Sequence, residues 1–295
     1  MSWITEEIVN GKKEKALNII LPTRGCSYNK CYMCSYSLGI KPEENLLKVI
    51  KNELKNRKVK KVKIFTSGSF LDEKEIKFED QMEIFEYLSN TDIEEVTVET
   101  RPEFVDRENL KKLKDTLNKV LEVAIGLESA NDYVLEYCIN KGFKYKDFLD
   151  ASEILSSLDI KIKAYVFLKP LFLTEYESII DAVNTCEKIE GIVDSVSINP
   201  MAIHKKTLAE YFWQKGEYKL PWIWSLLYVL NEVSDLDFYV ISHPVALGKR
   251  RGIHNCGKCD RDIGKLIAEY SLKNRKIDYY HECKEEWEKI LKREW

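Results

Sequence analysis

The sequence predicts an α/β fold: a partial, TIM-like (β/α)6 barrel followed by a small C-terminal extension that contains cysteines. Two observations lead to this prediction. Strand-like and helix-like segments alternate six times between residues 16 and 200, which is typical of a parallel sheet with helices outside it. Polar, small or metal-binding side chains follow the strands, where parallel α/β folds place their active sites. Six units fall short of the eight in a closed barrel, so we expect a lateral opening.

Each element is predicted from the spacing of its apolar residues. Buried strands are expected at 16–21, 59–66, 93–100, 119–128, 160–168 and 194–199. Helices are expected at 43–57, 78–89, 106–117 (with Asp106 as N-cap), 132–139, 144–158 and 175–189. After Pro200 we expect a helix at 226–233, a short strand at 238–241 and a charged helix at 282–293. The predicted division is an N-terminal extension (1–15), the barrel (16–200) and a C-terminal extension (201–295) that closes the barrel and is a candidate for a second metal site.

The composition narrows the class of protein. The net charge is −3, so the chain is not a strongly basic nucleic-acid-binding protein, although residues 245–295 hold 13 Lys and Arg against 9 Asp and Glu. No apolar run approaches the roughly 18 residues of a membrane span, and the first residues lack the features of a signal peptide. We therefore expect a cytoplasmic protein whose eight cysteines are reduced.

Three of those cysteines, Cys26, Cys31 and Cys34, lie within nine residues directly after the first predicted strand. Thiolates at this spacing converge on one metal centre more easily than they pair with each other. Three thiolates are one short of the usual set for zinc or for an iron–sulfur cluster, and a 4Fe–4S cluster held this way keeps one iron open for a substrate. A zinc knuckle with a distant fourth ligand and a chance grouping are the alternatives.

This loop resembles that of the radical S-adenosylmethionine (radical SAM) enzymes. The resemblance implies a 4Fe–4S cluster on Cys26, Cys31 and Cys34, with S-adenosylmethionine on the fourth iron and reductive cleavage to a 5′-deoxyadenosyl radical. The family usually shows C-x3-C-x2-C with an aromatic residue before the last cysteine. Here the first gap is x4, and Met33 stands in the aromatic position.

Other strand ends are candidates for binding the cofactor. The turn Ser67-Gly68-Ser69 resembles the family's glycine-containing turn, which meets the methionine amino group, and Gly68 permits close backbone approach. Arg101 is able to hold the methionine carboxylate bidentately, with a surface salt bridge as the alternative. Glu128 matches a polar residue that faces the ribose in the family. Its alternative is an exposed position beside a helix N-cap.

Five motifs extend the resemblance to one branch of the family, the archaeosine-forming radical enzymes (RaSEA type). They are T-R-G-C, F-T-S-G-S-F-L-D, V-E-T-R-P-E-F-V, G-L-E-S-A-N-D-Y-V-L and H-N-C-G-K-C. The middle motifs are also similar to the radical domain of the Elongator catalytic subunit. The resemblance implies a tRNA substrate, a partner enzyme (ArcS) that adds lysine to a 7-deazaguanine base, and an external electron donor. The radical enzyme then cleaves the lysine C–N bond to give archaeosine.

Two other functions stay open at this point. One is another radical reaction on RNA, such as thiomethylation or carboxymethylation. The other is a non-catalytic, zinc-dependent RNA-binding protein. The tract Lys249-Arg250-Arg251 could contact phosphates or form a solvated loop, and the aromatic residues between Trp213 and Trp224 could stack a base or complete the core.

A second cysteine group comprises Cys256, Cys259 and Cys283, with His243, His254 and His281 as candidates for a fourth ligand. Structural zinc, an auxiliary iron–sulfur cluster and unliganded thiols are all compatible with this pattern. Cys138 and Cys186 lie in apolar helical contexts and are predicted to be buried small hydrophobic residues.

Overall fold

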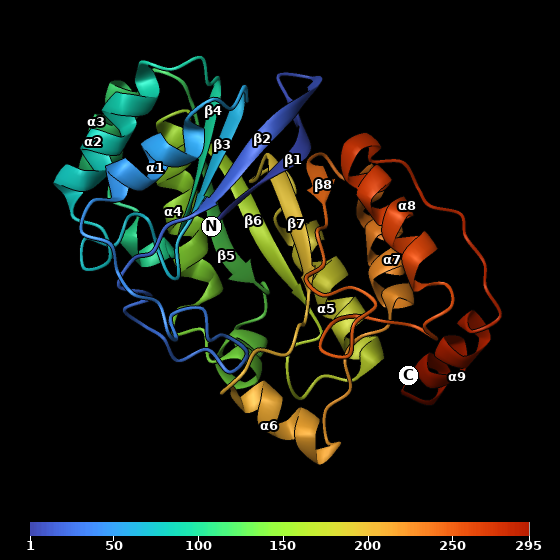
Figure 1. Cartoon of the computed structure of the whole chain (residues 1–295). Helices are drawn as coiled ribbons and strands as arrows, with labels where there is room; N and C mark the ends of the chain where they lie inside the picture. Colours follow the sequence, from blue (N-terminus) through green and yellow to red (C-terminus); the bar gives the residue numbers. More distant parts are fainter. Residues whose placement is uncertain (295) are drawn as a thin grey trace. The chain divides into compact units, whose positions relative to one another are not determined.

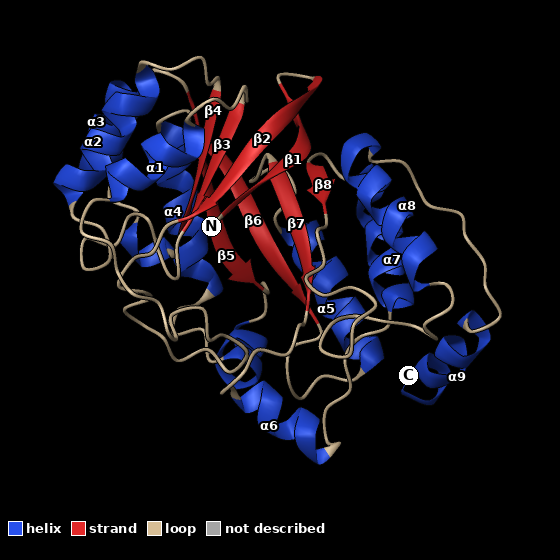
Figure 2. Ribbon diagram, viewed as in Figure 1, coloured by secondary structure: helices blue, strands red, loops and turns tan. Residues whose placement is uncertain are grey.

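A computed structural model of the chain describes residues 1–294, so that Trp295, the last residue of the predicted 201–295 extension, lies outside it. The strands are hydrogen bonded in chain order from β1 to β8 (Figures 1 and 2). Their bounds are β1 Ser2–Val9, β2 Lys12–Ile20, β3 Lys61–Phe65, β4 Glu95–Thr100, β5 Val120–Glu128, β6 Lys161–Leu168, β7 Ser195–Pro200 and β8 Tyr239–Ile241. All six predicted barrel strands are present, and β8 confirms the short strand expected after Pro200.

The helices follow the strands as the alternation predicts. They are α1 Leu46–Leu54, α2 Phe78–Ser89, α3 Arg107–Leu117, α4 Tyr145–Ser157, α5 Glu175–Lys188, α6 Leu208–Lys215, α7 Ile223–Glu232, α8 Asp260–Lys273 and α9 Lys284–Glu294. Short 3-10 helices occupy Pro102–Phe104 (η1) and Val233–Asp235 (η3). The prediction missed α6 and α8.

Local caps set several helix bounds. Asp106 caps α3 as predicted, because its side chain accepts a hydrogen bond from the Asn109 N–H at 2.9 Å. Helix α1 begins at Leu46 rather than at residue 43, because Asn45 is its cap and accepts from the Lys48 N–H. The helix expected at 132–139 is mainly a π-helix, Val134–Ile139 (η2), a form often found at functional sites.

Strand β1 was not predicted, since residues 1–15 were expected to form only an extension. It pairs antiparallel with β2 from Ser2 opposite Ile19 to Val9 opposite Lys12. Asn10 and Gly11 join the two strands and both have positive φ, 49° and 73°. Asn-Gly between two strands is the residue pair that a tight hairpin turn favours, so this signal was present in the sequence. Strands β2 to β5 then pair in parallel.

The chain divides into two compact units by its internal contacts. The first comprises Met1–Asn29, Tyr36–Gly126 and Lys146–Lys163, and the second comprises, within the described residues, Lys30–Ser35, Leu127–Tyr145 and 164–294. The predicted cysteine loop is shared, because Cys26 belongs to the first unit and Cys31 and Cys34 belong to the second.

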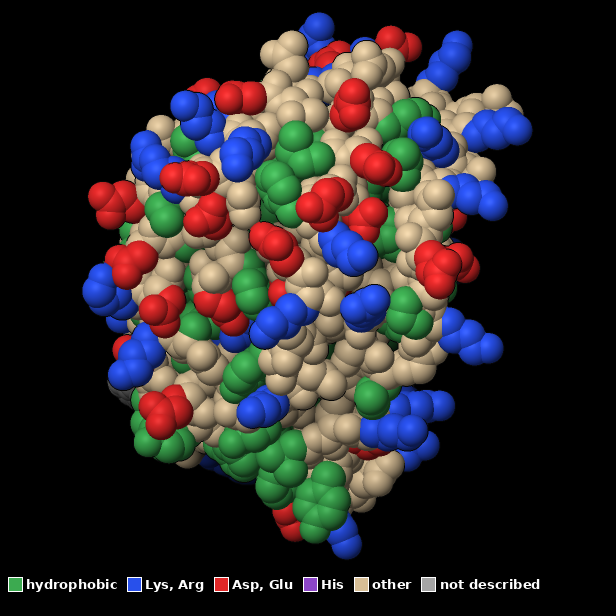
Figure 3. Space-filling model, turned by 90° about the vertical axis from the view of Figure 1, so that its left-hand side faces the viewer, with side chains coloured by type: hydrophobic (Ala, Val, Ile, Leu, Met, Phe, Trp, Pro, Cys, Tyr) green, Lys and Arg blue, Asp and Glu red, His purple; other side chains and the backbone are tan. Residues whose placement is uncertain are grey.

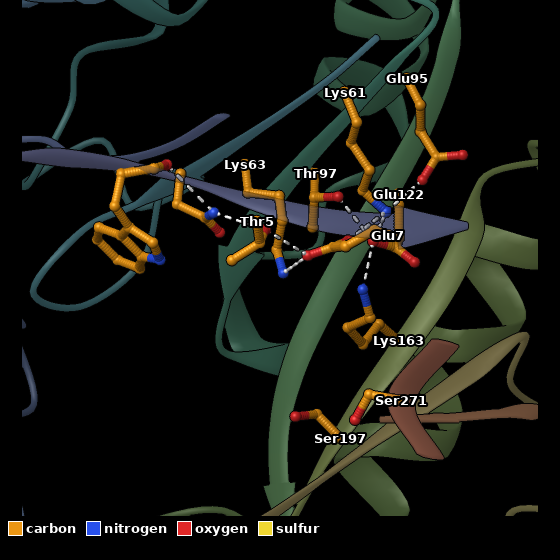
Figure 4. Close-up of polar contacts among 12 residues, drawn as sticks. Thr5, Glu7, Lys61, Lys63, Glu95, Thr97, Glu122, Lys163, Ser197 and Ser271 are labelled. Atoms are coloured by element: carbon orange, nitrogen blue, oxygen red, sulfur yellow. Dashed lines mark hydrogen bonds and ion pairs between the residues drawn. The ribbon is translucent and has the colours of Figure 1, made fainter. Parts of the chain in front are cut away.

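The first unit buries a layer of charged side chains from neighbouring strands (Figure 4). Lys61 on β3 lies 3.1 Å from Glu122 on β5, and Lys163 on β6 lies 2.7 Å from the same Glu122 oxygen. Glu7 on β1 pairs with Lys63 at 2.7 Å, and Lys61 also contacts Glu95. Burial alone would raise the pKa of Glu7, but the ammonium groups of Lys63, Lys163 and Lys61 lower it to about 2. This unit therefore depends on balanced buried charges as well as on apolar packing.

On the surface, Figure 3 shows the face at the left of Figure 1. Acidic and basic side chains are interspersed over its upper part, in keeping with the small net charge. No helix within residues 1–294 has the length and apolar character needed to span a membrane.

Candidate active site

In the first unit, the glycine turn after β3 packs directly against Cys26. A Cβ atom on Gly68 would lie 2.5 Å from the Cys26 Cα and 2.8 Å from its backbone nitrogen. Only a residue without a side chain fits this contact, as the sequence predicted for a close approach. The Cys26 sulfur also accepts a hydrogen bond from the Asn29 N–H at 3.3 Å. The structure thus places the predicted turn Ser67-Gly68-Ser69 beside the first cysteine.

Arg101 belongs to the same group of side chains. Its backbone N–H donates to the Ser69 Oγ at 3.1 Å, and its guanidinium lies 4.4 Å from the centre of the Tyr28 ring in the cysteine loop. Arg101 is only 5% exposed. It pairs at 2.5 Å with Glu103, whose side chain is 38% exposed. The salt bridge considered as an alternative is therefore present, and the role of Arg101 at the cofactor stays a prediction.

Glu75 is a buried residue that the sequence analysis did not select. It accepts hydrogen bonds from the Thr23 hydroxyl and, at 2.5 Å, from the Ser69 N–H. Burial raises its pKa, and these hydrogen bonds oppose the shift. Glu75 therefore connects the T-R-G-C segment to the glycine turn. No spacing in the sequence marked it, because it lies in a loop between two elements.

In the second unit, the rest of the cysteine loop is fixed by backbone hydrogen bonds. The Tyr32 N–H donates to the Ile139 carbonyl at 2.9 Å, and the Asn140 side chain donates to the Lys30 carbonyl at 2.8 Å. Ile139 is the last residue of the π-helix η2, so this helix holds the segment with Cys31 and Cys34. Met33 packs against the buried cluster that includes Val134 and Leu171.

Glu128, also in the second unit, ends strand β5 with a left-handed backbone, φ 70°. Its carboxylate lies 2.7 Å from the Lys141 ammonium, and the two side chains are 12% and 9% exposed. The alternative interpretation of Glu128, an exposed position beside a helix N-cap, is therefore wrong. Lys141 follows the π-helix and was missed, since only the fold brings it to Glu128.

Another strand end carries a buried ion pair. Lys169 follows β6 with φ 65° and pairs with Glu175, the first residue of α5. Glu175 also accepts hydrogen bonds from the Trp222 N–H at 2.8 Å and from the Ser225 hydroxyl. These contacts hold the start of α5 against the start of α7.

The second cysteine group is assembled within the second unit. Cys256, Cys259, His281 and Cys283 place one ligand atom each within 4.8 Å of one another. Of the three candidate histidines, the structure brings His281 to these sulfurs, whereas the His254 Nδ1 lies 2.9 Å from the Gly252 carbonyl. No disulfide joins any of the cysteines in residues 1–294. Cys138 and Cys186 are buried as predicted, and burial raises the pKa of Cys138 to about 11.

The aromatic group is partly core, and the basic tract is partly engaged in contacts within the chain. Trp224 and Tyr218 are buried, which favours the core over a stacking surface. The Arg250 and Arg251 guanidiniums each lie 5.1 Å from the centre of the Trp213 ring, and Arg251 pairs with Glu210 at 2.6 Å.

A family model described as "Radical SAM superfamily" matches residues 20–183, more than half of the chain, and the chain belongs to this superfamily. The chain is 40% identical to "Archaeosine synthase subunit beta" of Thermococcus kodakarensis. The match covers 98% of this chain and 95% of that protein. It is 36% identical to the protein of the same name from Methanosarcina acetivorans, over 98% of this chain and 89% of that one.

Solved structures confirm the fold. Elp3 from the archaeon Methanocaldococcus infernus matches with a TM-score of 0.56 and 14% identity, over 76% of this chain and 57% of that chain. The queuine lyase from Clostridium spiroforme, bound to SAM and queuine, matches with a TM-score of 0.53 and 19% identity. The match covers 72% of this chain and 88% of that chain. Together with the family and the strand order, these matches confirm a partial (β/α)6 barrel of the radical SAM type.

The chain is therefore a radical SAM enzyme, and its cofactors are a 4Fe–4S cluster and S-adenosylmethionine. The described residues fit these groups in two respects. A close glycine–cysteine packing exists at Gly68, and a buried arginine, Arg101, lies in the same unit as Cys26.

Proposed function

We propose that this chain modifies archaeal tRNA as the radical subunit of archaeosine synthesis, a lyase that cleaves the lysine C–N bond of a lysine-modified 7-deazaguanine. The observation that carries the proposal is the 40% identity to an archaeosine synthase subunit beta over 98% of this chain and 95% of that one. Because the match extends over nearly all of both chains, the two proteins share one domain composition over the matched length. The barrel, residues 16–200, is the catalytic part, and residues 201–295 are the extension with the second cysteine group.

We assign the 4Fe–4S cluster to Cys26, Cys31 and Cys34. Their place directly after β2 and their spacing support this assignment. Three thiolates leave one iron for S-adenosylmethionine, which when bound supplies the radical that starts the reaction. The protein's own part is to fix the loop. Asn29 and Gly68 hold Cys26 from one side, and the hydrogen bonds of Tyr32 and Asn140 hold the segment with Cys31 and Cys34.

We assign S-adenosylmethionine to Ser67, Gly68, Ser69, Arg101 and Glu128. Arg101 supports this role because it is buried, and because Ser69 and Tyr28 fix its backbone and its guanidinium plane. A preoriented guanidinium suits the planar carboxylate of the cofactor. Lys141 holds the carboxylate of Glu128, so this side chain is positioned to accept hydrogen bonds from the ribose hydroxyl groups.

The substrate and the partners follow from the same proposal. Because the substrate is tRNA, we expect the protein in the cytoplasm. It acts on the tRNA after ArcS has added lysine to the base. An external electron donor must reduce the cluster. Lys249 and Arg250 are exposed and are candidates for phosphate contacts, whereas Arg251 is partly buried and paired with Glu210.

The test uses the full chain, purified without oxygen and reconstituted with iron and sulfide. It is incubated with dithionite, S-adenosylmethionine and tRNA that ArcS has modified with lysine. We expect about four irons on the cluster cysteines, 5′-deoxyadenosine, and archaeosine in the digested tRNA. Cys31→Ala should abolish both products, and unmodified tRNA should yield no archaeosine.

The alternative functions give different outcomes. Cofactor cleavage with a thiomethylated or carboxymethylated base would replace the lyase assignment by another radical modification. An intact fold that binds zinc and tRNA, but never cleaves S-adenosylmethionine, would contradict the enzyme and favour an RNA-binding protein.

A further inference from the structure

The second cysteine group has the geometry of a single-ion site. The Cys256 and Cys259 sulfurs are 3.7 Å apart, and the Cys259 and Cys283 sulfurs are 3.6 Å apart. The His281 Nδ1 lies 3.8 Å from the Cys256 sulfur and 3.2 Å from the Cys283 sulfur. The same nitrogen is 3.3 Å from the Cys283 backbone N–H. Four donor atoms from two separate segments of the chain therefore surround one point.

These distances favour a single tetrahedral ion over an iron–sulfur cluster. Zinc binds thiolates at 2.3 Å in a tetrahedron, which sets its sulfur ligands about 3.8 Å apart. A 4Fe–4S cluster binds each thiolate through a different iron, so its sulfurs must stand further apart than the ligands of one ion. We propose that Cys256, Cys259, His281 and Cys283 bind one Zn2+ in a closed Cys3His site, a site separate from the radical cluster and independent of the proposed substrate.

Hydrogen-bond donors around the thiolates support a charged metal site. The Asn255 side chain donates to the Cys259 sulfur at 3.4 Å, and the Trp224 indole N–H donates to the Cys283 sulfur at 3.3 Å. Three thiolates on Zn2+ leave a net charge of −1, which such donors stabilise. In an apolar site without a metal, these donors would face neutral thiols, which are weak acceptors.

The turn between the first two cysteines is also fixed in a form that suits a zinc knuckle. Gly257 has φ +84°, and a Cβ there would meet no atom within 4 Å, so the backbone conformation rather than space requires glycine. Asp260 Oδ1 accepts hydrogen bonds from the Asn255 N–H at 3.1 Å and the Gly257 N–H at 3.2 Å. Asp260, the first residue of α8, therefore holds the turn that presents Cys256 and Cys259.

The ion would join the start of α8 to the start of α9. The segment between the two ligand pairs contains Tyr279, whose ring stacks on that of Trp224 with 5.8 Å between the ring centres. The Lys284 ammonium lies 5.9 Å from the centre of the Trp224 ring. These side chains, with Tyr176 and Trp287, line a cavity of 540 Å³. Zinc would thus stabilise this end of the second unit and fix one wall of the cavity.

The experiment measures zinc and iron by mass spectrometry in the full-length protein, purified without added metal. We expect about one zinc per chain in the wild type and in a Cys26→Ala, Cys31→Ala, Cys34→Ala triple variant that lacks the cluster. Cys259→Ser should lose zinc and keep the cluster iron, and Cys186→Ala, which removes a buried thiol of α5 outside both groups, should keep both metals.

A second measurement does not depend on a folded variant. Wild-type protein, stripped of zinc and titrated with Co2+, should show the intense d–d absorption of a tetrahedral ion and thiolate-to-cobalt charge transfer, both reversed by Zn2+. Loss of about four irons in Cys259→Ser would overturn the proposal in favour of an auxiliary cluster. Failure of the wild type to bind either ion would also overturn it, and neither result would bear on the cluster at Cys26.

Discussion

The two cysteine groups of this protein contrast in how their ligands are supplied. Cys26, Cys31 and Cys34 come from one short loop, and no fourth protein ligand is required for an iron that binds S-adenosylmethionine. Cys256, Cys259, His281 and Cys283 come from two segments, and one ligand atom of each lies within 4.8 Å of the others. In our proposals, the first group leaves a position open for chemistry, and the second closes around one ion. Their separation in the chain makes each one testable without the other.

The largest expected effect is on the open group. Cys26→Ser should remove the cluster and lower 5′-deoxyadenosine formation by at least about 1,000-fold, because the radical chemistry belongs to the cofactor. Zinc content should stay at the wild-type level. Cys186→Ala, which removes a buried thiol of α5, is the matched control and should retain cofactor cleavage within about twofold. Loss of zinc in Cys26→Ser would show that the two groups are not independent.

Gly68→Ala should have the next largest effect. The new methyl group would overlap the backbone of Cys26, and overpacking of this kind costs about 1–3 kcal/mol. We expect cofactor cleavage to fall by roughly 10–100-fold, measured as 5′-deoxyadenosine per cluster. The control is Gly264→Ala in helix α8, where the Cβ would meet only a Leu247 methyl group at 3.0 Å. Equal loss in both variants would contradict a specific role for Gly68.

A smaller effect is expected at Arg101. Lysine keeps the charge but loses the planar, bidentate fork, so Arg101→Lys should raise the KM for S-adenosylmethionine about 10-fold with unchanged iron content. Arg107→Lys is the control, since Arg107 is bonded to Ser157 at an exposed site. If both variants bind the cofactor equally, the assignment of Arg101 is wrong and its role is confined to the contacts with Tyr28 and Glu103.

Glu7→Gln should change the iron and zinc content least. This variant tests whether a lower free energy of unfolding is enough by itself to reduce the metal content. The pKa of Glu7 is lowered to about 2 from 4.5, so its carboxylate stabilises the folded state above about pH 4.5 and loses this contribution as the pH falls towards 2. Urea unfolding should show a deficit of about 3 kcal/mol at pH 7.

That deficit should shrink steadily as the pH falls from 4.5 towards 2, because the Glu7 carboxylate of the unfolded wild-type chain then becomes protonated while that of the folded chain stays ionised. Iron and zinc should both remain at wild-type levels in the folded variant at pH 7. A deficit that is independent of pH would show that Gln at position 7 disturbs packing rather than charge.

Much of the first group could be predicted from sequence because its ligands are local. The sequence alone shows the C-x4-C-x2-C spacing, the glycine turn and the six alternating units. The fold confirms the barrel. His281 could not be selected from the three histidines, because His254 lies as close in sequence to Cys256 as His281 lies to Cys283, and only the fold shows which imidazole reaches the sulfurs. Glu75 was missed because it lies in a loop without a periodic pattern, and Lys141 because only the fold brings it to Glu128.

The π-helix and the first strand show two other limits. The hydrophobic spacing of 132–139 predicts helix but does not distinguish a π-helix from an α-helix, which differ only in the hydrogen-bonding step. Strand β1 was overlooked although Asn10-Gly11 is a turn signal, because its exposed face gave it little apolar character. The six-unit pattern consists of buried strands with continuous apolar runs, and a partly exposed edge strand does not fit that pattern.

Strand β1 has a consequence for any truncation of the chain. Removing residues 1–10 would expose the N–H and C=O groups of β2 along one edge, and such an edge invites pairing with another chain. It would also take Glu7 from Lys63 and leave a buried ammonium group without this carboxylate. A shortened protein should therefore self-associate in a salt- and concentration-dependent way, even though the deletion removes none of the residues assigned to the cluster, to S-adenosylmethionine or to zinc.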